Sequence, residues 1–298
     1  MRQILVDASN MWCRAYYGTY LELPGGAVMV MGIMLKKLIN HFGKGGVDSI
    51  VMCWDKGHSN REEIDANYKA NRELIPGREN VWKDIHWVKK LVSSAGIKSA
   101  YFNGYEADDV IASLSKNFIG ETIIVSNDKD FYQLINDKKD IKVYKPGQKI
   151  KNKVIPAKII KEEDVLAHKD FLCMPIKVTL VKAFKGDVSD NVPKLADHEG
   201  KAVRWSKKFK EPFYEIVGLN DKVKTIDDFY KYISCFETKY QPALNSFKEQ
   251  AKKNFEIVTM KRDLEVEFHK PRSDREWFED ICEKLDINKI TYGDITGR

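Results

Sequence analysis

The sequence contains few cysteines, and their spacing fits neither a disulfide framework nor a structural zinc site. Five cysteines occur among 298 residues, and no two of them form a CxxC pair. An odd, scattered set of this kind is typical of a protein in a reducing cytoplasm. Cys13 and Cys53 lie within apolar runs, which favours packed thiols over nucleophiles.

Long apolar runs and the common catalytic motifs are missing as well. No stretch is long enough to cross a membrane, and Asp7 interrupts the first apolar run before a signal-peptide core could form. The chain has no Walker A loop, no GxSxG and no GxGxxG, and none of its six histidines has a partner at metal or triad spacing. We therefore expect a cytoplasmic protein without a membrane partner. Hydrolysis through a Ser or Cys nucleophile is unsupported.

The chain is moderately basic. Its 50 Lys and Arg residues exceed its 44 Asp and Glu residues, which gives a formal net charge of +6 and a pI of about 8.8. Nine of the carboxylates, which are identified by their positions after apolar runs or at the start of helical ones, are expected to lie together. The rest of the surface must then be more basic than the net charge of the whole chain suggests. This favours a polyanionic partner. A lysine-rich surface that only aids solubility is the alternative.

Apolar periodicity predicts an α/β fold. Continuous β-prone runs at 4–6, 50–54, 100–102 and 123–125 indicate buried parallel strands, and i, i+3, i+4 patterns predict helices over 27–42, 81–95 and 107–118. This alternation implies a three-layer domain with a central, mainly parallel sheet over residues 1–165. Residues 166–298 indicate a mainly helical part, with a strand within 258–268 and a last helix around 275–285. The basic, proline-containing stretch 149–161 is the expected connection between them.

Nine acidic residues stand out because they follow apolar runs or begin helical ones. They are Asp7, Asp55, Glu106, Asp108, Asp109, Asp128, Asp130, Asp187 and Asp190. Singly, each can be a helix cap, a turn residue or an acid that complements a helix dipole. Together they predict one site, because the carboxyl ends of parallel strands meet at one edge of a sheet.

So many carboxylates in one place repel one another. A single pair 4 Å apart costs roughly 4 kcal/mol at an effective dielectric near 20. We therefore expect bound cations, and hard oxygen ligands suit Mg²⁺ or Mn²⁺. Two such ions are the usual means of hydrolysing a phosphodiester, so the acids predict a metal-dependent nuclease.

Basic and aromatic residues alternate between the second and third predicted strands. Lys69 and Arg72 are three residues apart and would share one face of a helix, as a solvated basic face or as a clamp for a phosphate. The residues that continue this pattern are Tyr68, Arg78, Trp82, Lys83, Trp87, Lys89 and Lys90. Cations among aromatics suit single-stranded nucleic acid, although half of the aromatics could belong to the core.

These segments resemble the 5′ nuclease (flap endonuclease) family, especially the nuclease domain of bacterial DNA polymerase I and related bacteriophage 5′→3′ exonucleases. The matching motifs are LVDASNMWCRAYYG with the family's opening, YKANR with YKxxR, YEADDVIASL with the EADD box, SNDKDFYQL with the GDKD box, and KGDVSDNVP with MGDxSDNxP. GGAVMVMGIMLKKL and IVTMKRDLEVE extend the likeness over nearly the whole chain. No polymerase module follows, so the resemblance predicts a free-standing enzyme in a bacterial cytoplasm or a phage-infected cell.

The resemblance implies a PIN-like three-layer core followed by a helical DNA-binding subdomain that completes the metal site. It makes the nine acids ligands of two Mg²⁺ ions, for which Mn²⁺ would substitute. Lys69 and Arg72 become active-site cations at the base of a compact helical arch broken at Pro76–Gly77. The residues expected to contact DNA are Arg14, Tyr68, Arg78, Lys83 and Lys201.

The chain departs from the family at one place. Where relatives continue into the glycine-containing hairpin GVxGIGxKTA, this sequence has KLADHEGKAV at 194–203. Lys201 keeps the lysine position, but Asp197 and Glu199 replace the first two glycines. Glycines allow a backbone to approach phosphates closely, so the helix-hairpin-helix grip on duplex DNA is expected to be degenerate.

The sequence thus predicts a Mg²⁺-dependent 5′→3′ exonuclease and 5′ flap endonuclease of DNA replication or repair, acting as a monomer on DNA with 5′ ends, nicks or flaps. An RNA–DNA hybrid is left open as a further substrate. One rival is a PIN-like ribonuclease, although such domains are usually shorter and lack the helical half carrying Asp187 and Asp190. The other is a junction-binding protein that has lost its chemistry, which would be marked by missing ligands.

Overall fold

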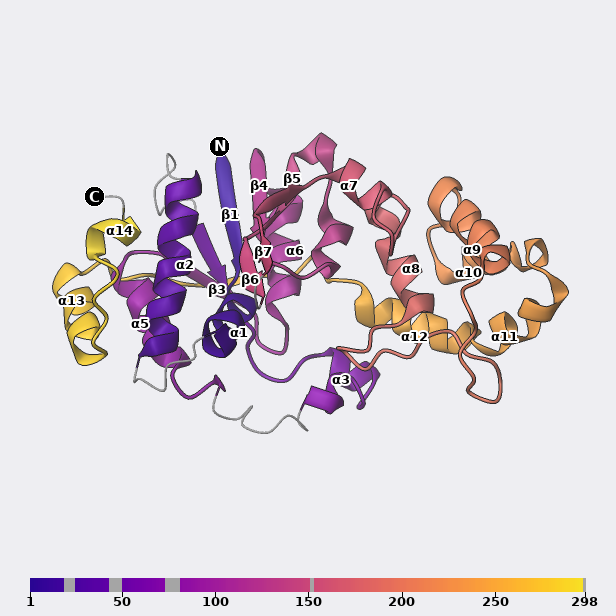
Figure 1. Cartoon of the computed structure of the whole chain (residues 1–298), viewed down its shortest axis with the longest axis horizontal. Coiled ribbons are helices and arrows are strands. Elements are labelled where there is room, and N and C mark those ends of the chain that lie inside the picture. Colours follow the sequence, from indigo (N-terminus) through magenta and orange to yellow (C-terminus); the bar gives the residue numbers. More distant parts are fainter. Residues whose placement is uncertain (19–24, 43–49, 73–80, 151–152, 297–298) are drawn as a thin grey trace.

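A seven-stranded sheet forms the centre of the molecule (Figure 1) in the computed structural model, which describes residues 1–18, 25–42, 50–72, 81–150 and 153–296. The strands are β1 (Arg2–Asp7), β2 (Ile50–Cys53), β3 (Lys98–Tyr101), β4 (Glu121–Val125), β5 (Ile141–Lys145), β8 (Lys158–Ile160) and β9 (Glu267–His269). Their order is β8-β5-β4-β1-β2-β3-β9. The five central strands are parallel, and both edge strands are antiparallel.

The chain reverses its direction of travel across the sheet beside β1. It passes from β1 to β2 and β3 on one side, then crosses to β4 and β5 on the other. Crevices that hold ligands form outside the carboxyl ends of strands at such a switch point. In this sheet the crevice opens where Asp7 ends β1 and where residue 126 follows β4.

Side chains of β1 alternate between two hydrophobic cores. Ile4 and Val6 face one core, which is covered by α1 (Ala8–Gly18), α2 (Gly26–Phe42), α5 (Ile85–Ser94), α13 (Arg275–Lys284) and α14 (Tyr292–Thr296). Leu5 faces the second core, which is covered by α6 (Ala107–Asn117) and α8 (Val178–Lys185). Helices on both faces require strands that are apolar throughout, which is why these strands show no polar alternation.

The second core continues without a break into the helical part. Its members include Phe184 of α8 and the buried rings of Phe209, Phe213 and Phe229. The remaining helices here are α7 (Glu162–Leu166), α9 (Lys207–Tyr214), α10 (Ile226–Tyr230), α11 (Gln241–Ser246) and α12 (Lys248–Val258). Figure 1 shows α9 to α11 at one end of an elongated molecule, with α12 leading back toward the sheet.

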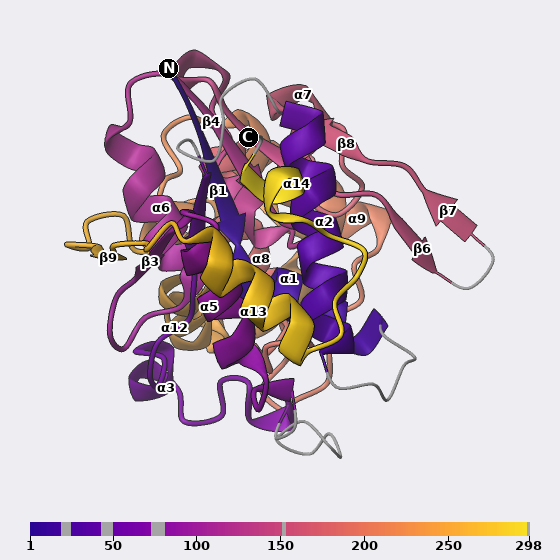
Figure 2. The ribbon, with the colours of Figure 1, turned by 90° about the vertical axis from the view of Figure 1, so that its left-hand side faces the viewer.

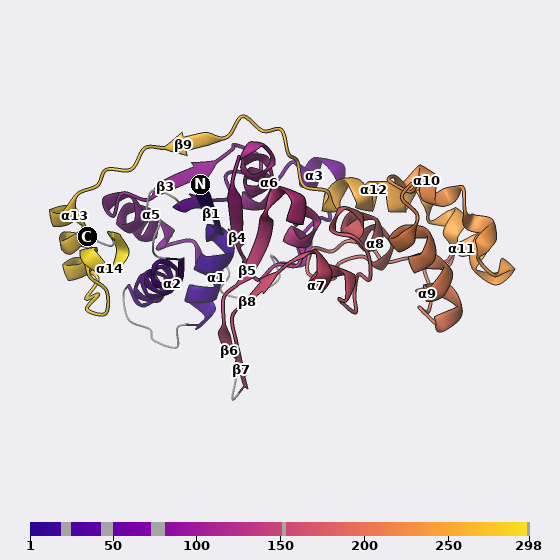
Figure 3. The ribbon, with the colours of Figure 1, turned by 90° about the horizontal axis from the view of Figure 1, so that it is seen from above.

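The C-terminal segment returns to the sheet. Figure 3 shows β9 running beside β3 and leading to α13 at the opposite end of the molecule from α9. Residues 267–296 therefore pack on the α/β part. The division at residue 165 stays a prediction, to which the structure adds this returning segment.

The predicted fold class is confirmed. The expected connection at 149–161 is wrong, because most of this segment forms strands. β6 (Gln148–Ile150) and β7 (Lys153–Ile155) form an antiparallel hairpin, and β8 then joins the main sheet. Figure 2 shows this hairpin extending away from the body. β5 was also missed, and the expected strand within 258–268 is reduced to β9 because α12 reaches Val258. None of the helices described in these ranges is long and apolar enough to cross a membrane.

Candidate active site

Seven of the nine predicted acids line one cavity at the carboxyl edge of the sheet. The cavity measures about 220 Å³. Its acids are Asp7, Asp55, Glu106, Asp108, Asp128, Asp130 and Asp190. An adjoining pocket of about 650 Å³ shares Asp128 and Asp130 with it and adds Asp187. The tertiary structure therefore gathers residues that are up to 183 positions apart in the chain, from Asp7 to Asp190.

Asp7 lies at the floor of the cavity with an exposed fraction of 8%. Its Oδ1 accepts a hydrogen bond from the backbone N–H of Asn10 (3.0 Å), and its Oδ2 accepts one from the Ser126 hydroxyl (2.9 Å). Burial, together with the nearby charge of Asp55, raises the pKa of Asp7 to about 7. A carboxylate in this condition is stabilised by a cation that replaces its lost water.

The N-terminus of α6 joins two further acids. Asp55 follows β2, and its Oδ1 accepts the backbone N–H of Ala107 at 2.8 Å, so it supplies one of the hydrogen bonds that the first turn of α6 needs. Glu106 precedes the same turn, and its Oε2 accepts Lys69 Nζ at 2.6 Å and the Tyr68 hydroxyl at 3.2 Å. Burial alone would raise the pKa of Glu106, but Lys69 and Arg61 hold it below its usual value.

A second set of acids comes from three different places in the chain. One carboxylate oxygen each of Asp130, Asp187 and Asp190 lies within 4.8 Å of the others. Residues 187–190 form a turn closed by a backbone pair between Asp187 and Val192. This turn directs Asp187 and Asp190 toward Asp130.

Asp109 does not reach the cavity. It is fully buried, and its Oδ1 accepts hydrogen bonds from Arg61 Nη2 (2.9 Å) and the backbone N–H of Lys261 (2.8 Å). Its Oδ2 is buried without a hydrogen-bond partner among the described residues. The structure thus places Asp109 behind the other acids, tying α6 to the segment after α12.

Lys69 and Arg72 lie at the rim of the cavity, but not on an α-helix as expected. Lys69 has a left-handed backbone (φ 57°), and a single 3-10 turn, Ala70–Arg72, follows it. The backbone N–H of Lys69 donates to the carbonyl of Asp190 at 3.0 Å, and the Arg72 guanidinium pairs with the Asp190 carboxylate. Both cations are therefore fixed against acids of the site.

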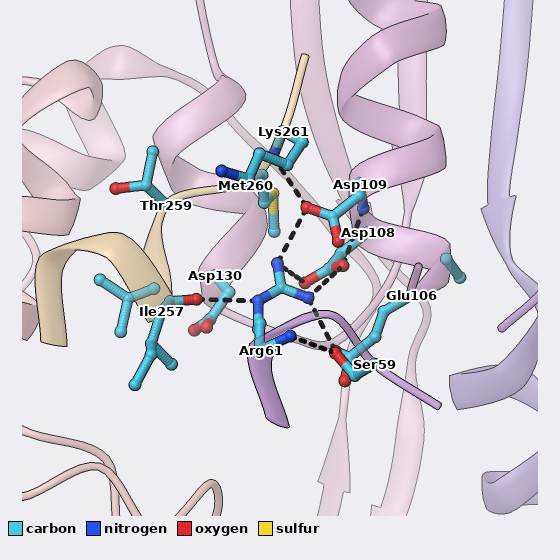
Figure 4. A network of polar contacts seen from close by, with 12 residues as sticks. Ser59, Arg61, Glu106, Asp108, Asp109, Asp130, Ile257, Thr259, Met260 and Lys261 are labelled. Carbon is cyan, nitrogen blue, oxygen red and sulfur yellow. Dashed lines mark hydrogen bonds and ion pairs between the residues drawn. The ribbon is translucent and has the colours of Figure 1, made fainter. Parts of the chain in front are cut away.

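Sequence reasoning missed Arg61, which connects three of the acids (Figure 4). Its side chain is 4% exposed, and its guanidinium contacts Glu106 at 3.1 Å, Asp108 at 3.3 Å and Asp109 at 2.9 Å. Its Nε donates to the carbonyl of Ile257 near the end of α12, at 2.8 Å. A planar fork with five donors suits such a convergent set of acceptors. Nothing in the local stretch SNREEID distinguishes this arginine from a surface residue.

Lys182 was also missed. It lies on α8 with an exposed fraction of 6%, and its Nζ pairs with Asp130 and, at 2.8 Å, with Asp187. Although burial opposes the effect, Lys182 and the Ser189 N–H and hydroxyl groups hold the pKa of Asp187 down at about 2. A signal was available, because a lysine within the apolar run VTLVKAF is rarely buried without a carboxylate partner.

The chain itself therefore offsets much of the repulsion that was expected to need bound metal. Arg61, Lys69, Arg72 and Lys182 form ion pairs with six of the nine acids. Within the described ranges, Asp7, Asp55 and Asp128 form no such pair. These three line the same cavity and define its least compensated part.

Comparison with known proteins assigns the chain to a family. The family model of the 5′-3′ exonuclease N-terminal, resolvase-like domain matches residues 2–168. The chain belongs to this 5′-3′ exonuclease family. The predicted resemblance is confirmed.

Individual relatives agree with this assignment. A Bacillus subtilis protein named 5′-3′ exonuclease is 32% identical over 205 residues, which cover 64% of this chain and 64% of that protein. The thermostable DNA polymerase I of Thermus aquaticus is 26% identical over 98% of this chain and 33% of its own length. A bacteriophage T5 D15 flap endonuclease, solved with DNA and metal ions, has a TM-score of 0.60 at 16% identity and covers 96% of this chain and 100% of that one. The last likeness shows the fold alone.

The donor set of this 5′-3′ exonuclease family member fits divalent metal. All candidate ligand atoms are carboxylate oxygens, which hard divalent cations prefer over nitrogen or sulfur donors. Asp130, Asp187 and Asp190 would hold such an ion, in competition with Lys182 and Arg72. Asp7, Asp55 and Asp128 line the same cavity without an ion pair among the described residues and offer further carboxylate oxygens.

The five residues predicted to contact DNA fall in different surroundings. Arg14 lines the 650 Å³ pocket, whereas Lys83 and Lys201 are exposed outside both cavities. Tyr68 is 6% exposed and packs on Val192, so its ring is unavailable for stacking on a base. Arg78 and the arch break at Pro76–Gly77 lie outside the described residues.

Proposed function

We propose that this chain is a divalent metal-dependent 5′→3′ exonuclease and 5′ flap endonuclease that hydrolyses phosphodiester bonds in DNA. It acts as a monomer, with two Mg²⁺ ions for which Mn²⁺ substitutes. Its substrates are DNA 5′ ends, nicks and flaps, met in a cytoplasm during replication or repair. RNA–DNA hybrids are included among the substrates to be tested.

The observation that carries this proposal is the division of the acidic cavity. One group, Asp7, Asp55 and Asp128, forms no ion pair among the described residues, and the other, Asp130, Asp187 and Asp190, has Lys182 and Arg72 beside it and includes Asp187 from the adjoining pocket. Two such neighbouring groups suit two divalent ions that clamp a phosphodiester. A junction-binding protein without chemistry would have no use for this arrangement, and all nine acids are retained.

Bound divalent ions would supply Lewis-acid stabilisation of the phosphoryl oxygens and a more acidic water. The chain's own cations act on the same charge. Lys69 and Arg72 lie at the rim, each oriented by a carboxylate, and both can donate hydrogen bonds to the oxygens of the scissile phosphate. Because their positions are set before substrate arrives, little reorganisation is needed as charge develops in the transition state.

The adjoining pocket suits the DNA on one side of the scissile bond. Arg14, Lys129 and Lys185 contribute to its lining, and it opens directly onto Asp128 and Asp130. Cations that track a backbone beside the reaction centre bind nucleic acid without regard to sequence. Cleavage would then depend on the structure of the end rather than on the bases.

The decisive experiment compares labelled substrates under defined metal conditions. A 5′-labelled flap, a nicked duplex, a blunt duplex and an RNA–DNA hybrid are incubated with the protein in Mg²⁺, in Mn²⁺ and in EDTA. We expect cleavage near the flap junction and release of short 5′ products, lost in EDTA and restored by added Mg²⁺. Full-rate hydrolysis in chelator would contradict the two-metal reading.

The same substrates separate the rival functions. A PIN-like ribonuclease would cleave the RNA strand and leave every DNA strand intact. A junction-binding protein would bind the flap in all three metal conditions without cleaving it. Either outcome would replace the proposal.

A further inference from the structure

A second pocket, of about 280 Å³, lies at the β3–β9 edge of the sheet, and the proposed reaction uses none of its residues. Trp54 and Tyr101, at the carboxyl ends of β2 and β3, contribute flat rings to its floor. His269 of β9 stands beside them, because it pairs in register with Ser99. In Figure 3 this edge lies next to α5 and α13, at the opposite end of the molecule from α9.

The space exists because small side chains face each other there. Ser93 of α5 and Ser99 of β3 are both buried and both line the pocket. Their hydroxyls also engage neighbouring groups: Ser99 Oγ accepts the Trp54 indole N–H at 3.2 Å, and Ser93 Oγ accepts the backbone N–H of Arg272 at 3.2 Å. Helix α13 places the half-buried ring of Trp277 across this gap. The pocket is thus built by five elements: the end of β2, β3, β9, α5 and α13.

Two cations without carboxylate partners stand at the pocket. Lys89 and Lys90 of α5 line it, and neither forms a salt bridge with any residue that the structure describes. Lys89 Nζ lies 5.1 Å from the centre of the Trp54 ring, and Lys90 Nζ lies 4.6 Å from the centre of the Trp87 ring. Partial burial lowers the pKa of Lys89 against the opposing charge of Asp55. These ammonium groups are placed to take an anion.

The combination of walls limits the ligand. An apolar ligand would contact the aromatic rings but leave the two ammonium groups without an anion. A lone phosphate would pair with the ammonium groups but make no contact with the aromatic rings. A nucleotide uses both, through stacking of its base and neutralisation of its phosphate. The pocket lies slightly below the roughly 300 Å³ at which drug-sized sites begin, which suits a single base with its sugar.

We propose that this pocket binds one unpaired nucleotide of the 5′ single strand of the substrate, with its base beside the half-buried rings of Tyr101 and Trp277 and its phosphate at Lys89. The inference rests on the proposed nuclease function. It adds a site for the strand beyond the cleft and makes the length of the 5′ strand a determinant of affinity.

The pocket and the cleft share one structural element. Trp54 lines the pocket, and Asp55, the next residue, lines the acidic cavity. Lys56 follows, and its Nζ lies 3.8 Å from the centre of the Tyr101 ring. Lys56 Nζ also lies 3.5 Å from the Glu267 carboxylate. A strand that leaves the cavity past residues 55 and 56 would pass this ammonium group and the Tyr101 ring on its way to the pocket. A free nucleotide would need no such path, so we assign the pocket to the DNA strand.

The test measures affinity as a function of flap length. Two flap substrates are used, one with a single unpaired nucleotide and one with about eight, within the site sizes known for single-strand binders. Ca²⁺ replaces Mg²⁺ to prevent cleavage. The variants are Lys89→Ala, Trp277→Ala and Trp277→Phe, and Lys284→Ala is the control because Lys284 lies on α13 outside the pocket.

We expect Lys89→Ala and Trp277→Ala to weaken binding of the long flap about fivefold to tenfold, as loss of one stacking or phosphate contact predicts. Binding of the one-nucleotide flap should not change. Trp277→Phe should keep most of the affinity because it retains a ring, and Lys284→Ala should keep all of it. Lys89 is exposed, so the Lys89→Ala variant should fold. Its flap affinity can therefore be measured even if Trp277→Ala fails to fold.

Other outcomes overturn the assignment in distinguishable ways. Equal losses on both substrates would mean that the residues hold the duplex or the fold, and no loss would mean that the strand passes elsewhere. If a deoxynucleoside 5′-monophosphate quenches the tryptophan fluorescence and the effect of the substitutions on DNA affinity does not depend on flap length, the ligand of the pocket is a free nucleotide and not the DNA strand. If the unmodified protein cleaves neither flap in Mg²⁺, the proposed function fails, whereas cleavage without flap-length dependence overturns only the pocket.

Discussion

In and behind the acidic cleft, six of the nine acids pair with a cation of the chain, whereas in the hairpin at 194–203 an acid is held by backbone N–H groups. Asp197 Oδ1 accepts the backbone N–H of Glu199 at 3.0 Å and that of Lys201 at 2.9 Å. The N–H of Gly200 donates to the carbonyl of Asp197. Three amides of this turn, those of Glu199, Gly200 and Lys201, are thus satisfied within it.

This difference shows how a carboxylate can either prepare or block a site. In the cleft, acids are paired with cations that can exchange partners when metal or phosphate arrives. In the hairpin, the Asp197 carboxylate occupies the amides of Glu199 and Lys201, to which a DNA phosphate could otherwise bind, and it repels that phosphate as well. The structure therefore supports the expectation that the hairpin grips duplex DNA weakly.

The largest effect should follow from removing a ligand in the uncompensated half of the cleft. Asp128→Ala should lower the cleavage rate by more than about a hundredfold, beyond the tenfold to hundredfold typical of groups that only orient ligands. Affinity for a flap in Ca²⁺ should be unchanged or tighter, because one negative charge near the phosphate is gone. Single-turnover rates and equilibrium binding measure the two quantities, and joint loss of both would indicate a structural role.

Next in size is the loss of the rim cations. Lys69→Ala and Arg72→Ala should each lower the single-turnover rate by about 10²–10³, as removal of a preorganised donor predicts, with a smaller loss of substrate affinity. Lys83→Ala serves as the matched control, since Lys83 is exposed outside the cavity and should change affinity and its salt dependence alone. An unchanged rate at saturating enzyme would restrict Lys69 and Arg72 to positioning the substrate.

The third prediction concerns the contribution of the buried Arg61 guanidinium to the stability of the protein. Arg61→Gln leaves Asp109 buried without its partner and should destabilise the protein by about 3–5 kcal/mol. Urea unfolding measures the free energy, with Glu62→Gln as a control on the same short helix, where the side chain is largely exposed. Equal stability of the two variants would mean that the contacts with Glu106, Asp108 and Asp109 contribute little.

The smallest expected effect is a gain, at the hairpin. Replacing both Asp197 and Glu199 with Gly frees the amides and removes two negative charges, so affinity for a flap duplex should rise by about 1–2 kcal/mol if one or two phosphate contacts form. Asp197→Gly alone should give most of the gain, because Glu199 is exposed and accepts no backbone N–H among the described residues. Titration at several salt concentrations in Ca²⁺ measures this. An unchanged affinity and salt slope would place the duplex elsewhere.

Local sequence was sufficient to identify the site residues that lie at the ends of strands or at the start of a helix. Asp7 and Asp55 end or follow buried apolar runs, and parallel pairing of β1 with β2 brings such ends to one edge whatever the intervening loops do. Glu106 could be assigned to a helix start for the same reason, since a period of 3.6 begins at the next residue.

Three-dimensional packing alone decided which charges meet. Arg61 reaches Asp109 across 48 positions and the Ile257 carbonyl across 196, and no periodic pattern encodes such a contact. Asp108 and Asp109 are adjacent in one motif, yet the turn of the helix sends the first to the cavity and buries the second. Sequence determined which acids this protein has at its strand ends. Only the packing of α12 against α8 and against α3 (Arg61–Ile64) determined which of them pair with a cation of the chain and which are left to metal, because long-range burial sets that balance.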